Sequence, residues 1–373
     1  MRQLVTIKKI DAIYPIPKAD RIELVRIGGW TCIAKKGEFE VGSLCAYFEI
    51  DSFVPDTPIF EFLGRPTTHQ GKSGYRIRTM KMRGVISQGL ALPLHMFSGL
   101  TTLRLSKRFE VGVDIAEYLD VIKYDIDLTG SSNKSASGNS NPTNTSKGKF
   151  PSFIPKTDQE RVQNLPHYFD MYKDTLFEES YKLDGSSCTM YRIEKQPETF
   201  WEKVVEWLRL DRTTLPTHFG VCSRNLELSP PANGNTPSNF WYAAKKYHID
   251  RYLPVGYAIQ GEVIAPNIQA NYEKVAEPEF HIFSVYNIKE QCYLSPEDAE
   301  AFVTDYLPEA IYVKHTYIQL FQECTSFDDL QKRVDTPSIY SAQPISEGRV
   351  YKSVDGTVSF KVINNKYLLQ KDK

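Results

Sequence analysis

The sequence predicts a two-domain protein in which a compact all-β antiparallel barrel (residues 1–127) precedes an α+β domain (residues 150–373). A chain of 373 residues is long enough to bury two separate cores. The segment LTGSSNKSASGNSNPTNTSKGKF, from Leu128 to Phe150, consists almost entirely of Ser, Asn, Thr, Gly and Lys. Because it cannot bury enough apolar area to offset its ordering entropy, we predict a flexible linker over residues 128–149.

Four runs of β-branched and aromatic residues, separated by turn formers, predict the strands of the barrel. They are LVTIKKIDAIYPI, RIELVRIGGWTCIAKK, SLCAYFEID and YRIRTMKMRGVISQGLALPL. Gly28 and Gly29 lie inside the second run. They predict a bulge or a sharp bend, the device with which small barrels turn corners.

Helix and strand patterns are mixed in the second domain. FWEKVVEWLRL (200–210) has its apolar residues on one helical stripe, and Ser295 is an N-cap signal at the start of SPEDAEAFVTDYL. YAIQGEVIAP, EFHIFSVYNI and GRVYKSVDGTVSFKVI indicate strands. This domain is therefore expected to be built around antiparallel sheet.

The composition narrows the class of protein. It is 41% hydrophobic and 24% charged, which is typical of a globular chain and not of a disordered one. No apolar run approaches the roughly 20 residues that span a bilayer, and Asp11 interrupts any signal-peptide core. We therefore expect an intracellular protein, cytoplasmic or nuclear, that acts as a monomer. A net charge of −1 gives no global sign of a nucleic-acid partner, and six scattered cysteines without a C-x-x-C pair predict buried free thiols.

Asp355-Gly356, between two alternating runs, predicts a hairpin with a two-residue type I′ turn. That turn would pair Val354 with Thr357, Lys352 with Ser359, Tyr351 with Phe360, and Val350 with Lys361. Lys352 and Lys361 would then project from one face as diagonal neighbours, which is unfavourable unless an anion lies between them. A solvent-facing, lysine-rich hairpin is the alternative.

The stretch YKLDGSS (181–187) is a candidate nucleophile site. In a strand, Lys182 and Asp184 share a face, and Gly185 permits close approach of another group to the backbone. An amine attacks phosphorus only when deprotonated, so Lys182 would need a depressed pKa. Asp184 suits a divalent ion held through water. K-x-D-G alone is weak evidence, since it occurs by chance in about one chain in ten of this length; a plain charge at a strand end is the alternative.

Six motifs in order carry a resemblance to a known superfamily. They are YKLDGSS, SRNLEL, QGEVI, FHIFSVYNI, EGRVYKS and SFKVINNKYLL. The chain resembles the covalent nucleotidyltransferases, which comprise ATP-dependent DNA and RNA ligases and mRNA-capping guanylyltransferases. It is most similar to Naegleria-type and Deinococcus-type RNA ligases. The resemblance implies an OB-like barrel followed by an α+β nucleotidyltransferase domain with antiparallel sheets, the ATP-grasp-like ligase and capping fold. Residues 194–220 look like an insertion.

The resemblance implies a role for each matching residue. Lys182 would attack the α-phosphate of ATP and become lysyl-adenylate, while Asp184 and Glu347 would hold Mg²⁺ or Mn²⁺. Nucleotide contacts would come from Arg224 at the ribose or a phosphate, Glu262 at the ribose hydroxyls or the metal's outer shell, Phe283 stacked on adenine, and Lys352 and Lys361 at the α-phosphate.

One position departs from the superfamily pattern. Ligases commonly carry K-x-K in the last motif, whereas here the second place is Ile363. Lys352 and Lys366 are the two candidates to supply the missing contact.

Basic side chains gather in two short runs of the barrel, where an aromatic neighbour suits a groove that follows a nucleic-acid backbone. They are Arg76, Arg78, Lys81 and Arg83 beside Tyr75, and Lys35 and Lys36 after Trp30. A charged strand edge that discourages aggregation is the alternative.

The function expected from these features is ATP-dependent sealing of 3′-hydroxyl and 5′-phosphate RNA ends, in repair of nicks or breaks. The partner would be RNA, including a nicked duplex or an RNA/DNA hybrid. A capping guanylyltransferase and a noncatalytic RNA-binding protein with the same fold are the alternatives.

Overall fold

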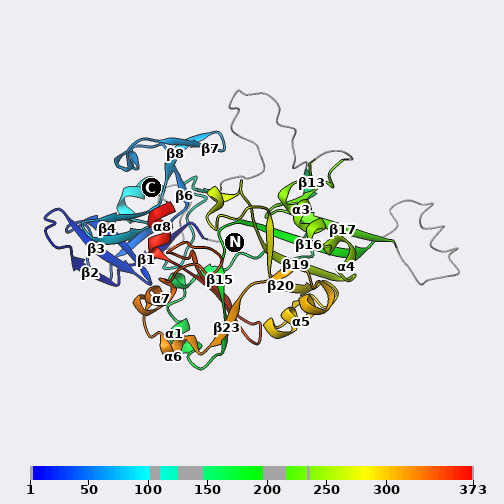
Figure 1. The fold of residues 1–373 in the computed structure, drawn as a ribbon. Helices are drawn as coiled ribbons and strands as arrows, with labels where there is room; N and C mark the ends of the chain where they lie inside the picture. Colours follow the sequence, from blue (N-terminus) through cyan, green and yellow to red (C-terminus); the bar gives the residue numbers. More distant parts are fainter. Residues whose placement is uncertain (1–2, 101–109, 125–145, 196–215, 233–235, 372–373) are drawn as a thin grey trace.

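The computed structural model describes residues 3–100, 110–124, 146–195, 216–232 and 236–371 (Figure 1). The predicted helix over 200–210, most of the predicted linker and most of the predicted insertion lie outside these residues. Within the described ranges, no helix combines the length and the apolar character that crossing a bilayer requires.

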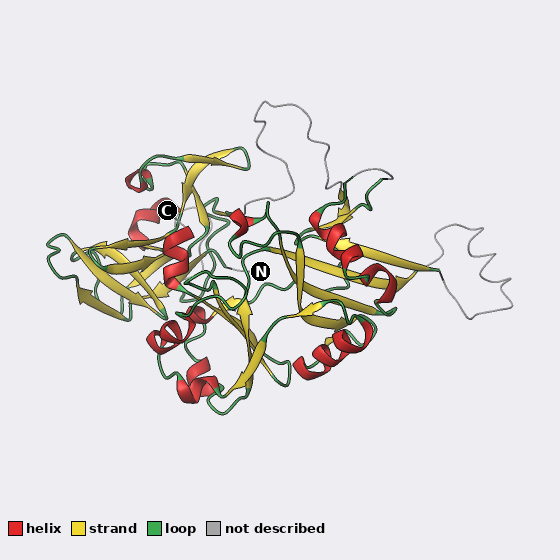
Figure 2. Ribbon diagram, viewed as in Figure 1, coloured by secondary structure: helices red, strands yellow, loops and turns green. Residues whose placement is uncertain are grey.

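The N-terminal domain consists of short antiparallel strands in four small sheets, as predicted for a barrel (Figure 2). In sheet order these are β1 (Val5–Lys9), β5 (Leu44–Phe48) and β11 (Leu90–Pro93); β2 (Ala12–Pro15), β3 (Ile22–Ile27) and β4 (Trp30–Lys35); β12 (Ile122–Lys123), β6 (Ser52–Pro55), β8 (Lys72–Arg76) and β7 (Thr67–His69); and β10 (Val85–Gln88) with β9 (Thr79–Met82). Two 3₁₀ turns, η1 (Glu61–Leu63) and η2 (Leu94–Leu100), complete it.

The predicted bend at Gly28-Gly29 is a two-residue hairpin turn, since Ile27 pairs with Trp30 across it. Gly28 has φ +58°, which favours glycine. Gly29 donates to the Gln163 carbonyl at 3.0 Å, and a Cβ there would lie 2.6 Å from the Gln163 Cα. The turn is therefore docked closely against the second domain.

The second domain contains two sheets, almost entirely antiparallel. The eight-stranded sheet has the order β13 (Ser146–Lys149), β18 (Leu226–Leu228), β17 (Thr217–Cys222), β16 (Ser186–Glu194), β19 (Tyr257–Ile264), β20 (Glu279–Asn287) and β21 (Cys292–Tyr293), with β22 (Ile311–Tyr312) also on β20. The five-stranded sheet has the order β14 (Glu160–Arg161), β25 (Ser359–Ile363), β24 (Gly348–Ser353), β15 (Phe177–Lys182) and β23 (His315–Ile318). The prediction of a linker through residue 149 was too long, because residues 146–149 pair with β18.

Helices cover one side of each sheet. Beside the eight-stranded sheet lie α3 (Asn239–Lys246), α4 (Ile249–Tyr252) and α5 (Pro296–Tyr306); beside the five-stranded sheet lie α1 (Tyr168–Met171), α6 (Leu320–Glu323) and α7 (Phe327–Val334). The remaining elements are η3 (Val162–Asn164), η4 (Gln269–Asn271) and α8 (Asn365–Lys371). Ser295 caps α5 as predicted, accepting from the Asp298 amide at 3.1 Å. All six cysteines are free, and all but the exposed Cys292 are buried.

The hairpin of β24 and β25 has the predicted register, with Val350 opposite Lys361 and Lys352 opposite Ser359. The predicted type I′ turn is wrong, because it requires positive φ at both central residues and only Gly356 has it. The Asp355 carboxylate accepts from the Thr357 amide at 3.0 Å, so Val354 and Thr357 do not pair and both strands stop earlier.

The two domains share an extensive interface. The red helix α8 at the end of the chain lies against the blue N-terminal strands in Figure 1. Ile50 packs there with Ile363, Tyr367 and Leu368. Asn164 accepts from Lys8 at 2.8 Å and Trp30 at 2.7 Å, and donates to Glu49 at 2.5 Å and Glu160 at 2.9 Å.

Candidate active site

Lys182 is the last residue of β15 in the five-stranded sheet, and β16 of the eight-stranded sheet begins at Ser186. Leu183 is buried between them, so the K-L-D-G stretch crosses from one sheet to the other. A Cβ on Gly185 would lie 2.4 Å from the Val263 carbonyl, so glycine allows this tight crossing. Asp184 therefore lies in a turn and not in a strand as predicted, but it still faces the same cavity as Lys182.

A cavity of about 360 Å³ lies where the two sheets and the N-terminal domain meet. Six of the residues predicted to bind the nucleotide or the metal line it: Lys182, Asp184, Arg224, Glu262, Glu347 and Lys361. The N-terminal domain contributes Asp51, Arg76, Lys123 and Tyr124. The structure thus brings together most of the residues that six separate motifs had indicated.

Two ion pairs organise the acidic end of this cavity. The Lys182 ammonium lies 2.8 Å from a Glu347 carboxylate oxygen, and the Lys371 ammonium lies 2.8 Å from an Asp184 oxygen. Burial acts to lower the pKa of Lys182, but the carboxylates of Glu347, Glu262 and Asp184 outweigh it and raise that pKa above the usual lysine value. The pKa of Lys182 is therefore not depressed in this structure, as a nucleophilic amine would require, but raised.

The carboxyl groups at this end are also perturbed. Burial raises the pKa of Glu262 to about 8; the Lys182 ammonium opposes the shift, and the negative charges of Glu347 and Asp184 add to it. Burial likewise raises the pKa of Glu347, against the attraction of Lys182. In both cases burial acts against the charged carboxylate, and the Lys182 ammonium acts in its favour.

The acidic residues fit a hydrated divalent cation. Across the described ranges, no group of three or more His, Cys, Asp or Glu side chains is placed to coordinate a metal ion directly. One Glu347 carboxylate oxygen is buried and has no hydrogen-bond partner among the described residues. Because Mg²⁺ usually keeps several waters and takes one or two carboxylates, Asp184 and Glu347 suit such an ion.

Arg224 and Lys361 lie on the wall of the cavity. One guanidinium nitrogen of Arg224, Nη2, donates to both carboxylate oxygens of Asp158, at 2.5 and 2.7 Å. The positive charges of Arg224 and Lys361 both act to lower the pKa of the nearby Asp158 carboxyl group. Their charges face the space where an anionic ligand would lie.

Phe283 and Lys352 line a second cavity, of about 130 Å³, which shares residues 156–159 with the first. Phe283 is the extra residue of a bulge in β20, because Gln260 pairs with Ser284 and Gly261 with Ile282. The Lys352 ammonium donates to the Phe283 carbonyl and, at 3.0 Å, to the Ser284 hydroxyl.

Lys352 and Lys361 line different cavities in this structure, and their joint contact with one anion stays a prediction. Lys352 is oriented toward β20 and lies 3.9 Å from the buried Glu178 carboxylate. Burial lowers the pKa of Lys352, and Glu178 opposes that shift. The two lysines therefore belong to neighbouring cavities.

The first basic run is divided between two sheets. Arg76, in β8, pairs with Asp51 at 2.7 Å and stacks over Tyr124 at the large cavity. The others lie on the surface, as does the second run: Arg78, Lys81, Arg83, Lys35 and Lys36. Arg76 and Arg78 therefore do not share a strand face.

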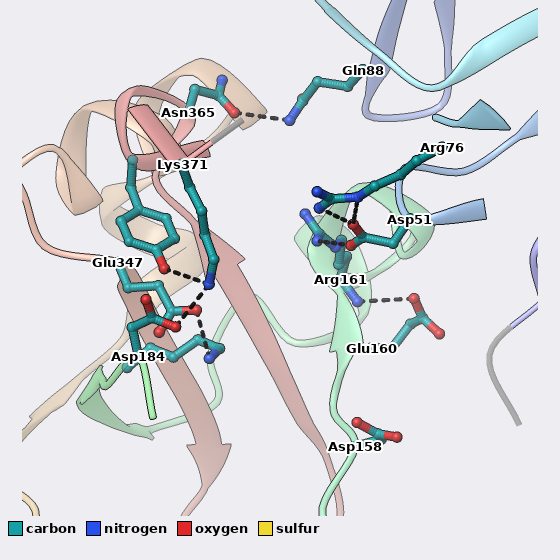
Figure 3. A network of polar contacts seen from close by, with 12 residues as sticks. Asp51, Arg76, Gln88, Asp158, Glu160, Arg161, Asp184, Glu347, Asn365 and Lys371 are labelled. Atoms are coloured by element: carbon teal, nitrogen blue, oxygen red, sulfur yellow. Dashed lines mark hydrogen bonds and ion pairs between the residues drawn. The ribbon is translucent and has the colours of Figure 1, made fainter. Parts of the chain in front are cut away.

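Sequence reasoning missed two residues of the site. Arg161 is buried 3.7 Å from Asp51 and lines the cavity, and Lys371 reaches Asp184 from α8 (Figure 3). Arg161 belongs to the KTDQERVQNLP run that contributed to the resemblance, so that motif was a usable signal. A lone lysine such as Lys371 carries no pattern.

Comparison with known proteins agrees with this geometry. The profile of the RNA ligase family matches residues 176–363, and that of an OB-fold domain matches residues 4–94. The first match spans β15 to β25 and includes Lys182, Glu347 and Lys361. No match was found among curated proteins. The match of residues 4–94 to an OB-fold domain confirms the expected OB-like barrel.

Solved structures of an RNA ligase from Naegleria gruberi are similar to this chain over its whole length. A glutamate-to-alanine variant with ATP and Mn is 33% identical, with a TM-score of 0.80 and complete coverage of both chains. The structure with PPi and another variant with AMP and Mn are 34% identical, with the same TM-score and coverage. The predicted order, a barrel ahead of the α+β domain, is the order in these structures.

Proposed function

The chain belongs to the RNA ligase family, and from this premise we propose that it joins 3′-hydroxyl and 5′-phosphate RNA ends with ATP. The reaction would take three nucleotidyl transfers. AMP would pass from ATP to Lys182, then to the RNA 5′-phosphate, and the 3′-hydroxyl would finally displace it. The observation that supports this best is Lys182 inside a cavity that also holds Glu262, Glu347 and Lys361.

In the first transfer, the Lys182 amine attacks the α-phosphorus of ATP. The N–P bond forms, the P–O bond to the β-phosphate breaks, and pyrophosphate leaves with the electron pair. The amine must first lose the proton that Glu347, Glu262 and Asp184 now stabilise. Asp184 and Glu347 would hold a divalent cation, whose positive charge would oppose the ammonium form of Lys182 and neutralise the triphosphate.

The remaining residues would bind the nucleotide. Lys361 and Arg224 line the large cavity and would hold phosphate or ribose oxygens, while Glu262 would bind the ribose hydroxyls or ordered water. The second cavity, with Phe283 on its wall, suits a planar base. Lys352, in the same cavity, would then contact the base edge in place of the phosphate that we first expected.

The exposed basic residues of the barrel suit an RNA backbone. They are Arg78, Lys81, Arg83, Lys35 and Lys36, with Arg76 at the cavity edge. RNA bound over this surface would lead its 5′-phosphate end into the cavity. Sealing of nicks or breaks, as in RNA repair, is the role that this arrangement favours.

Nucleotide choice and sealing test the proposal together. The protein with Mn²⁺ is expected to incorporate label from α-labelled ATP, and to seal a nicked duplex whose 3′-hydroxyl strand is RNA. Lys182→Met should abolish both, because no other amine takes its position. Labelling from GTP in place of ATP would favour a capping guanylyltransferase. Absence of any covalent label would favour a noncatalytic RNA-binding protein.

A further inference from the structure

The helix α8 delivers a lysine to the carboxylates of the cavity. Its buried Tyr367 packs near Ile50 and Ile363, and one turn later Lys371 lies 2.8 Å from Asp184 and 3.0 Å from the Tyr367 hydroxyl. Figure 3 shows Lys371 reaching from α8 toward Asp184, with Glu347 alongside. The Asp184 side chain is only 7% exposed, so solvent has little access to its carboxylate and Lys371 supplies the charge that balances it.

Three lysines are candidates for an additional cation at this site, and the structure separates them. Lys352 lies in the neighbouring cavity with Phe283. Lys366 pairs with Asp335 at 2.5 Å, and its side chain is 62% exposed. Lys371 lines the cavity that contains Lys182 and Lys361. Neither candidate that we named from the sequence therefore reaches this cavity.

Ile363 occupies the place of the second lysine in the last motif, so an additional cation for this cavity has to come from another position. It lies two residues after Lys361 and packs against Ile50, Tyr367 and Leu368. This position therefore contributes to the contact between the domains, and the same contact holds α8 where Lys371 can reach Asp184. A lysine at 363 would bury its stem in an apolar cluster.

We propose that Lys371 is a counter-ion that neutralises Asp184 until a divalent cation replaces it. This rests on the proposed function, in which Asp184 holds that cation. An ammonium at 2.8 Å and a divalent ion require the same carboxylate, and their like charges repel. The Lys371 side chain is 34% exposed, so it can leave Asp184 without disturbing the core around Tyr367. Lys371 and the metal ion therefore compete for the Asp184 carboxylate.

Mn²⁺ binding to the nucleotide-free, full-length protein tests this directly. Titration followed by the electron paramagnetic resonance signal of unbound Mn²⁺ gives the dissociation constant without any turnover. Lys371→Met is expected to bind Mn²⁺ about fivefold to tenfold more tightly than the wild type. Lys371→Arg keeps the positive charge and should bind no more tightly than the wild type. Lys366→Met, which removes a lysine from the same helix outside the cavity, should leave the constant unchanged.

A Lys371→Met protein that binds Mn²⁺ no more tightly than the wild type, including the case in which neither binds, overturns the proposal. Weaker binding by this variant would mean that Lys371 orients Asp184 for the metal. Thermal unfolding checks that each variant is folded. Labelling with ATP is measured separately: a wild type that shows the Mn²⁺ competition but forms no covalent adenylate would refute the ligase function while leaving the competition intact.

Discussion

At the scale of single residues, carboxylates surround Lys182 and favour its ammonium form. Glu347 lies 2.8 Å from the Lys182 ammonium, and the surrounding carboxylates keep that pKa high. Motif spacing identified the lysine and its acidic neighbours. It could not predict the sign of the pKa shift, which depends on three carboxylates meeting in space.

The raised pKa of Glu262, about 8 against 4.5, predicts a pH-dependent stability. Between these values the folded protein holds a proton that the unfolded chain releases, so this group lowers stability as pH rises, by at most about 1.4 kcal/mol per pH unit. The Glu262→Gln variant has no carboxyl group at this position, so it lacks this contribution to the pH dependence of stability. In the metal-free protein, its melting temperature relative to the wild type should rise between pH 5.5 and pH 8.

Glu290→Gln is the matched control, because Glu290 is exposed near the end of β20. Its difference from the wild type should stay flat with pH. A flat difference for Glu262→Gln as well would contradict the perturbed pKa.

At the scale of elements, the crossing from β15 to β16 places Lys182 and Asp184 between the sheets, and Gly185 makes it possible. Gly185→Ala would press a methyl group against the Val263 carbonyl. We expect it to cost about 1–3 kcal/mol in the free energy of unfolding, measured by urea denaturation. Gly148→Ala, whose Cβ meets no atom within 4 Å, should change stability by less than about 0.5 kcal/mol. Equal effects of the two substitutions would refute this role for Gly185.

Sequence patterns predicted the presence of strands and helices better than the residues at which they end. The register of β24 and β25 was predicted from the position of the Asp355-Gly356 turn, and it is confirmed, including Val350 opposite Lys361. The turn was wrong because the Asp355 side chain captures the Thr357 amide, a local bond that periodicity does not encode. The contact of Lys352 with β20 was not predicted, since the bulge at Phe283 offers a carbonyl that no pattern in β24 could indicate.

At the scale of the whole molecule, the cavity belongs to both domains. Arg76 and Asp51 of the barrel meet Arg161 of the second domain, and Asn164 joins residues of both. The sequence placed a nucleic-acid surface on the barrel and the chemistry on the second domain. It gave no sign that the barrel would line the cavity that contains Lys182, because contacts between domains leave no periodic signal in either.

Under the proposed function, Lys182 is the residue that carries AMP. Incubation of the full-length protein with ATP and Mn²⁺, followed by proteolysis at neutral pH and mass spectrometry, locates the adduct directly. We predict one AMP, in an acid-labile phosphoramidate bond, on the peptide that contains Lys182, and none in Lys182→Met. AMP on any other residue, or an adduct that survives in Lys182→Met, would contradict this assignment.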